Sequence, residues 1–274
     1  MNHIGIMEGR LVPPEKDRFQ AFPRERWAEE FDLAAQVPLS YIEWIFDLYG
    51  ADVNPIATRD GLDQLRAHIH SSGVAVRSLC ADYFMDRPFL RCSAQERSAR
   101  EGELRNLMAN CQALGIRRIV LPFVDQSRID TPEECAVVVD VLHRALEPAR
   151  ATGLELHLET SLGPAEFADL LARIPDPLLL ANYDSGNSSS LGYAPAEELA
   201  AYGHRVGSVH IKDRVLGGGT VPLGTGSADF PSLFDGLRKI SYAGDFTLQV
   251  ARGAAGDEVN WARQNIAFVR RYWP

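Results

Sequence analysis

A unit of helix, glycine and strand recurs along this chain, and this repeat constrains the fold more than any other feature. Four helical patterns end directly before a glycine, and a short aliphatic run follows each glycine. We expect each glycine to be the C′ residue of its helix, because that position needs a left-handed backbone. The four units are Leu62–Ser72, Gly73 and Val74–Leu79; Leu104–Leu114, Gly115 and Ile116–Leu121; Leu142–Thr152, Gly153 and Leu154–Glu159; and Glu197–Tyr202, Gly203 and Val206–Ile211.

The expected helix starts agree with this division. Ser93 with Glu96, and Thr131 with Glu134, have the spacing of capping boxes. Pro132 stands at the first helical position, where its missing N–H costs nothing. Pro164, Pro195 and Pro231 are placed in the same way.

Strands that alternate with helices form βαβ units and a parallel sheet. Eight strands can be counted, at about His3–Met7, Tyr41–Ile45, Val74–Leu79, Ile116–Leu121, Leu154–Glu159, Leu178–Tyr183, Val206–Ile211 and Phe246–Val250, with a last helix from about Glu258 to Arg271. Eight such units in 274 residues predict one α/β domain spanning 1–274, a single (β/α)8 TIM barrel. An open doubly wound sheet is the weaker alternative, because Met7-Glu8-Gly9-Arg10 lacks the glycine-rich dinucleotide-binding motif.

Charge and cysteine content narrow the possible partners. The formal net charge is −9, which disfavours nucleic acid and anionic membranes as partners. The four cysteines have neither C-x-x-C nor metal-finger spacing, so we expect reduced thiols. The first residues do not resemble a signal peptide, and no apolar stretch is long enough to span a bilayer. We therefore expect a cytoplasmic protein.

In a barrel of this kind, function resides at the carboxyl ends of the strands. Glu159, Asp184, His210 and Gln249 stand at the ends of strands five to eight. Alternation along each strand puts all four on the face that points to the barrel axis, whereas neighbours such as Leu158 and Val209 face outward. We expect these four side chains to converge at a similar height.

Two carboxylates, one imidazole and one amide carbonyl make a mixed oxygen and nitrogen site. Such a site suits one divalent metal ion (Mn²⁺, Mg²⁺, Co²⁺ or Zn²⁺) with open positions for substrate oxygens. A metal that chelates a carbonyl and a neighbouring hydroxyl acidifies the carbon-bound proton and stabilises an enediolate. A carboxylate nearby, such as Glu159, then takes the proton. This is the chemistry of aldose–ketose isomerisation or epimerisation.

Other polar residues at strand ends are candidates for substrate contacts, namely Glu8, Arg10, Lys212, Asp213 and Arg252. Arg10, Lys212, Arg214 and Arg252 are suited either to a phosphate or to ion pairs with surrounding acids. The glycine run 217–219 fits either a phosphate cradle or a flexible lid. Taken singly, any of these side chains is more often structural than functional. His157 also points inward, and a hydrogen-bonded core histidine is the favoured interpretation.

Several runs of the sequence resemble the sugar phosphate isomerase/epimerase family, the xylose isomerase-like TIM barrels. The resemblance covers essentially the whole chain and rests on Gly5-Ile6-Met7-Glu8-Gly9-Arg10-Leu11, Leu121-Pro122-Phe123-Val124-Asp125-Gln126-Ser127, Leu158-Glu159-Thr160, Tyr183-Asp184-Ser185-Gly186-Asn187 and Val209-His210-Ile211-Lys212-Asp213. Members of this kind include L-ribulose-5-phosphate and hexulose-phosphate epimerases and D-tagatose 3-epimerase. The resemblance implies carbohydrate substrates, and it makes a homo-oligomer an open possibility.

The resemblance also implies a metal held by Glu, Asp, His and Glu, of which the first three fall on Glu159, Asp184 and His210. The fourth falls on Gln249, and Asn187 stands where relatives often carry a histidine that contacts substrate or metal. Glutamine can offer its carbonyl oxygen to a metal but cannot accept a proton. Two-base epimerisation is therefore in doubt, whereas one-base isomerisation or β-elimination through Glu159 survives.

The histidines are too few and wrongly placed for the related three-metal endonucleases, which share the barrel. Two other hypotheses stay open beside the isomerase or epimerase. One is a lyase or dehydratase that acts on a keto-sugar or keto-polyol, including the cleavage of C-glycosides. The other is a sugar-binding barrel without catalytic activity.

Overall fold

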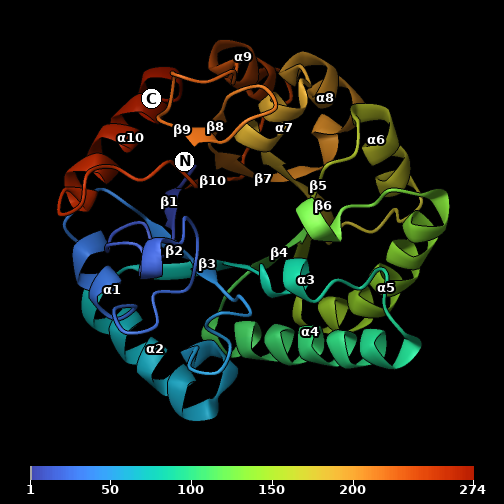
Figure 1. Cartoon of the computed structure of the whole chain (residues 1–274), viewed down its shortest axis with the longest axis horizontal. Coiled ribbons are helices and arrows are strands. Elements are labelled where there is room, and N and C mark those ends of the chain that lie inside the picture. The colour runs from blue at the N-terminus through green and yellow to red at the C-terminus, as the bar shows by residue number, and fades with distance from the viewer. Residues whose placement is uncertain (1) are drawn as a thin grey trace.

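Eight parallel strands close into a barrel in the computed structural model, which describes residues 2–274 (Figure 1). The strands are β1 (Ile4–Met7), β2 (Tyr41–Ile45), β3 (Ala75–Cys80), β4 (Arg118–Phe123), β5 (Glu155–Thr160), β6 (Leu179–Asp184), β7 (Val206–Ile211) and β10 (Asp245–Leu248). β1 pairs with both β2 and β10, so the first and last strands close the ring. The predicted barrel is confirmed and the open-sheet alternative is wrong. We infer that 1–274 is one domain.

The helices surround the strands as an outer ring (Figure 1). They are α1 (Glu29–Ala34), α2 (Arg59–Ser72), α3 (Tyr83–Asp86), α4 (Ala94–Leu114), α5 (Pro132–Thr152), α6 (Pro164–Ala172), α7 (Ser185–Leu191), α8 (Pro195–Tyr202), α9 (Phe230–Lys239) and α10 (Glu258–Tyr272). A short antiparallel hairpin, β8 (Asp213–Arg214) with β9 (Thr220–Val221), follows β7. The glycine run 217–219 forms the end of this hairpin. Of the helices within residues 2–274, none is both long enough and apolar enough to cross a membrane.

Three of the four expected C′ glycines have the predicted conformation. Gly73, Gly115 and Gly153 have φ values of 71°, 74° and 68° after α2, α4 and α5. Gly203 does not, because its φ is −55° and the chain continues into a 3-10 turn over Gly203–Arg205. A Cβ at Gly203 would lie 3.2 Å from the side chain of Ile240, so close packing explains this glycine better than backbone handedness.

The predicted helix starts are confirmed with two differences. Pro231 is the second residue of α9 rather than the first. Ser93 and Glu96 form a reciprocal capping box at the start of α4. Thr131 caps α5 by accepting from the N–H of Glu134. Glu134 itself accepts from the N–H of Asp130 rather than from Thr131, so the second half of the predicted box is wrong.

The apolar core lies between the strands and the helix ring, where outward residues such as Leu156, Leu158 and Val209 are fully buried. The inside of the barrel is instead polar. Tyr41, Glu43, Ser78, Arg118, His157, Asn182, Ser208, His210 and Thr247 are all buried there and joined by hydrogen bonds. Buried polar groups need partners, so this network fixes the inward side chains in single orientations.

Candidate active site

The inward side chains at the carboxyl ends of β5, β6 and β7 meet at one point. Glu159, Asp184 and His210 are buried, and one potential ligand atom from each lies within 4.8 Å of the other two. Nδ1 of His210 lies 3.2 Å from Oε2 of Glu159 and 3.9 Å from Oδ2 of Asp184. The predicted convergence of these three side chains is thus present, and each stands at the end of its own parallel strand.

Glu43 on β2 fixes the orientation of His210. Its Oε1 lies 2.7 Å from Nε2 of the imidazole, while Ser78 donates to its other oxygen at 2.6 Å. Nδ1 of His210 is buried and has no hydrogen-bond partner among the described residues. Burial opposes the charged imidazole, but the carboxylates of Glu43 and Glu159 outweigh it and raise the pKa of His210 to about 10. Nδ1 therefore faces two carboxylates, in a region that attracts positive charge.

The two carboxylate oxygens of Asp184 have different roles: one caps a helix and the other faces the candidate metal site. Oδ1 accepts from the N–H groups of Gly186 and Asn187, both at 2.8 Å, and so caps the N-terminus of α7. Oδ2 is left on the side of His210, 3.5 Å from Nζ of Lys212. Two carboxylates and an unpartnered imidazole nitrogen are a donor set that fits a divalent metal ion. The chain thus contains a candidate metal site.

Two amide groups hold the carboxylate of Glu159. Asn182 donates to Oε2 at 2.9 Å, and Asn187 donates to Oε1 at 2.5 Å. The carbonyl of Asn182 accepts from Ser208 at 2.6 Å, and the Ser208 oxygen lies 2.7 Å from Nδ1 of His157. A carboxylate only accepts hydrogen bonds, so the Asn182 N–H₂ group must face Glu159 and its carbonyl must face Ser208. His157 is the hydrogen-bonded core histidine that was expected.

Gln249, the predicted fourth ligand, makes hydrogen bonds to two other side chains. Its Oε1 accepts a hydrogen bond from Nζ of Lys212 at 3.1 Å, and its Nε2 donates to Gln20 at 3.0 Å. The Lys212 side chain packs directly against Gly186. A Cβ at Gly186 would lie 2.5 Å from the Lys212 side chain, so only glycine leaves room for it. Metal ligation by Gln249 stays a prediction, since its carbonyl would first have to leave the ammonium group.

Substituting Gln249 by glutamate tests this position. A third carboxylate beside the three candidate ligands is expected to tighten Mn²⁺ binding at least tenfold, because it adds a charge close to the ion. Calorimetric titration of the metal-free protein would measure the change. Gln126→Glu makes the same change at an exposed position near the end of β4 and serves as the control. Equal affinities for Gln249→Glu and the unsubstituted protein would show that this side chain lies outside the coordination sphere.

Two arginines that were predicted to bind substrate donate hydrogen bonds to backbone carbonyls of the protein. Arg10 donates to the carbonyls of Val250 and Phe19 and to the side chain of Gln20. Arg252 donates to the carbonyls of Phe19 and Val12. Both guanidinium groups therefore fix the long segment between β1 and α1, and their assignment to substrate stays a prediction. Sequence position alone does not reveal backbone carbonyls as their partners.

Two predicted substrate-binding carboxyl groups are also engaged elsewhere. Glu8 is fully buried and accepts from the N–H of Ile45, and burial raises its pKa well above the usual range, with the charge of Glu30 adding to this. Asp213 is fully buried too, and accepts from the N–H groups of Gly224, Gly226 and Ala228. Neither lines the cavity described below, and these two assignments stay predictions as well.

Asp213 should therefore matter for stability. Asp213→Ala leaves three backbone N–H groups without their acceptor, and we expect a loss of about 3 kcal/mol in the free energy of unfolding. Urea denaturation measures this loss. Asp169→Ala, at an exposed position on α6, should change the same quantity by no more than about 0.5 kcal/mol. A loss for Asp213→Ala as small as that of the control would contradict this structural role.

A cavity of about 240 Å³ opens beside the candidate metal site. Glu159, Asn187 and Lys212 line it, and so do Gln20, Asp82, Arg214 and Gln249. Of the four cations considered for a phosphate, only Lys212 and Arg214 lie at this cavity. Gln20 and Asp82 were not predicted to be functional, and neither was Glu43. Glu43 could have been found as an acid in an otherwise apolar strand, but nothing local distinguishes Gln20.

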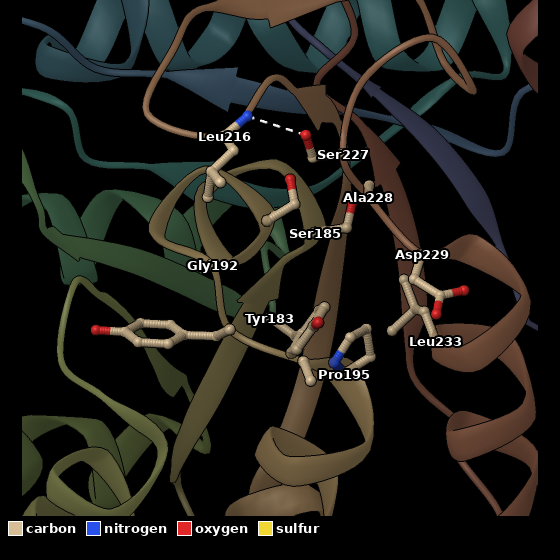
Figure 2. Close-up of a pocket in the computed structure, with 12 residues that line it drawn as sticks. Tyr183, Ser185, Gly192, Pro195, Leu216, Ser227, Ala228, Asp229 and Leu233 are labelled. Carbon is tan, nitrogen blue, oxygen red and sulfur yellow. Dashed lines mark hydrogen bonds between the residues drawn. The ribbon is translucent and has the colours of Figure 1, made fainter.

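A larger cavity of about 310 Å³ lies on the other side of α7 (Figure 2). Tyr183, Ser185, Pro195 and Leu233 line it, and Leu216 reaches over it from the β8–β9 hairpin. Its polar groups are already engaged: Ser185 donates to the carbonyl of Lys212, and Tyr183 donates to Glu198. The smaller cavity is the better candidate, because Glu159, one of the three candidate metal ligands, lines it and none of the three lines the larger cavity among the described residues.

The fold and the site together define a class, a (β/α)8 barrel with a candidate metal site of carboxylates and an imidazole at the carboxyl ends of its strands. Residues 31–272 match the profile of the xylose isomerase-like TIM barrels. The chain belongs to this family, as its motifs indicated.

Two relatives of similar sequence are named for different reactions, one an epimerisation and one a dehydration. A putative L-ribulose-5-phosphate 3-epimerase, SgbU of Escherichia coli, is 25% identical over 82% of this chain and 83% of its own length. An inosose dehydratase of Geobacillus kaustophilus is 32% identical, over 42% of this chain and 44% of its own length.

Solved structures of similar fold include metal-bound and sugar-bound proteins. The IolI protein with a bound zinc atom has a TM-score of 0.79 at 18% identity, covering 99% of both chains. D-allulose 3-epimerase from Methylomonas sp. in complex with D-allulose has a TM-score of 0.74 at 18% identity, covering 99% of this chain and 97% of that one. At this identity, the similarity establishes the fold.

Proposed function

We propose that this chain is a metal-dependent isomerase or epimerase of a small sugar or sugar phosphate, and that Glu159 is its base. The observation that supports this most is that Nδ1 of His210 faces the carboxylates of Glu159 and Asp184, and that Glu159 also lines a cavity. The epimerases among the relatives agree with this reaction class.

Glu159, Asp184 and His210 would hold the ion. A divalent ion bound there would polarise the substrate carbonyl and stabilise the negative charge of an enediolate. Glu159 takes the proton from the carbon next to the carbonyl, and Asn182 and Asn187 hold its carboxylate toward that carbon. Lys212 and Arg214 bring positive charge to the cavity wall, where they can bind substrate oxygens or a phosphate. Phe19, Met85 and Val124 contribute apolar surface to its lining.

A dehydratase or lyase that uses the same base is the second candidate. The dehydratase relative favours it, since removal of the same proton begins both reactions. A sugar-binding barrel without activity would bind ligand but would exchange no proton.

Incubating the metal-loaded protein with a panel of ketoses and keto-sugars in D₂O separates these functions by NMR. We expect deuterium to enter a carbon next to the carbonyl, and the labelled carbon distinguishes isomerisation from epimerisation. Loss of water or of an aglycone would establish the lyase instead. Binding without any exchange would contradict both enzymatic functions.

A further inference from the structure

The cavity beside the candidate metal site contains a second buried carboxyl group. Asp82 follows β3 and is 6% exposed, and it lines the same 240 Å³ cavity as Glu159. Asp125 also lines this cavity, but it is exposed to solvent. The fourth strand-end position expected for a second base holds Gln249, which cannot accept a proton. Asp82 is therefore the buried acid, besides Glu159, that this cavity offers among the described residues.

A line of hydrogen bonds fixes Asp82 across the mouth of the barrel. Nζ of Lys212 donates to Oε1 of Gln249, whose Nε2 donates to Oε1 of Gln20. Nε2 of Gln20 then donates to Oδ2 of Asp82 at 2.6 Å. Arg10 also donates to Oε1 of Gln20, which independently fixes the way this amide faces. The two glutamines thus join an ammonium group at one end to a carboxylate at the other.

The surroundings of Asp82 suit a group that gains and loses a proton near neutral pH. Burial raises its pKa to about 6, the charges of Glu159 and Asp47 add to this, and hydrogen bonds from Gln20 and Cys80 oppose it. The Cys80 thiol is the nearest alternative, but burial raises its pKa well above the usual range. Arg10 lies close enough to Asp82 for the two charges to interact, but its N–H groups donate to two backbone carbonyls and to Gln20.

We propose that Asp82 is the second acid–base residue of this site and returns a proton to the carbon that Glu159 deprotonates. This inference rests on the proposed function. Glu159 first takes the proton, so the C–H bond breaks and its electron pair forms the enediolate. Asp82 in its protonated form then gives its proton to the same carbon, and a new C–H bond forms. Glu159 is left protonated and Asp82 ionised, and both return to their starting states by proton exchange with water.

Asp82→Asn separates the two proton transfers. The substrate is a sugar that the unsubstituted protein both converts and labels in D₂O. We expect Asp82→Asn to form product at least about 100-fold more slowly, while deuterium enters the remaining substrate at close to the original rate. Glu159→Gln should lose both. Asp82→Glu, which restores a carboxyl group, should recover part of product formation.

Metal binding shows whether the Asp82→Asn protein is correctly folded. The rise in Tm on adding Mn²⁺ should equal that of the unsubstituted protein, because Asp82 makes its hydrogen bonds with Gln20 and Cys80 and with none of the three candidate ligands. Product formation at the original rate in Asp82→Asn would overturn the proposal. An equal loss of exchange and product would overturn it too, as would a reaction that releases water. No exchange by the unsubstituted protein would instead refute the proposed function itself.

Discussion

Replacing Glu159 by glutamine is expected to slow product formation about a thousandfold or more at saturating metal. Glutamine has almost the same shape and keeps a carbonyl oxygen, but it cannot accept the carbon-bound proton. Asn182 and Asn187 both donate to the present carboxylate, and one of them would face the new amide N–H₂ group. The carboxamide would therefore also be less well oriented. The rate of conversion of the sugar identified in the D₂O panel measures the effect.

Glu166→Gln provides the matched control for this substitution. Glu166 is exposed on α6, so the same loss of charge there should leave the rate of product formation unchanged. If Glu159→Gln kept more than about a tenth of the original rate, Glu159 would not be the base, and the proton acceptor would have to be another group.

Metal binding should raise the thermal stability of this chain, and Asp184→Asn should remove most of that effect. At an ion concentration of about 100 times Kd, binding adds about 2.7 kcal/mol to the free energy of unfolding. For a chain of this size, the corresponding rise in Tm is roughly 5–10 °C. In Asp184→Asn the carbonyl can still cap α7, because Oδ1 accepts both N–H groups there. The N–H₂ group would then face the ion, and we expect the affinity to fall by at least about 100-fold.

Thermal unfolding at increasing Mn²⁺ concentration measures both quantities. Asp229→Asn is the control, since Asp229 caps α9 by accepting from Ser232 and makes no hydrogen bond to the three candidate ligands among the described residues. It should show the same metal-dependent rise in Tm as the unsubstituted protein. An unchanged affinity in Asp184→Asn would remove Asp184 from the site.

The barrel was predictable because its repeat is local: each helix stop and the strand after it can be read from neighbouring residues. Strand boundaries were less accurate: five of the predicted strands began too early, and two of these did so for one physical reason. The N–H of Ile116 bonds to the carbonyl of Cys111, and the N–H of Leu154 bonds to Ala149. The residue after the C′ glycine still belongs to the helix cap, so β4 and β5 begin later than their aliphatic runs.

The three central site residues were predictable because strand alternation determines which side chains point inward. Outside the strands this argument fails. Arg10, Asp213 and Arg252 stand at strand ends, but their partners are backbone groups of loops whose course no local pattern determines. Gln20 is the clearest case, because it reaches Asp82 and Gln249 only through the path of the long segment between β1 and α1.

A crystal of the zinc-loaded protein, measured at the zinc absorption edge, tests the central claim most directly. We predict one anomalous peak at the carboxyl ends of β5, β6 and β7. It should lie about 2.0–2.2 Å from Nδ1 of His210, a carboxylate oxygen of Glu159 and Oδ2 of Asp184. The same map decides whether Oε1 of Gln249 leaves Lys212 to join the ion. A protein that retains no zinc, or a peak that leaves Nδ1 of His210 without a metal bond, would contradict the proposed metal site and the chemistry built on it.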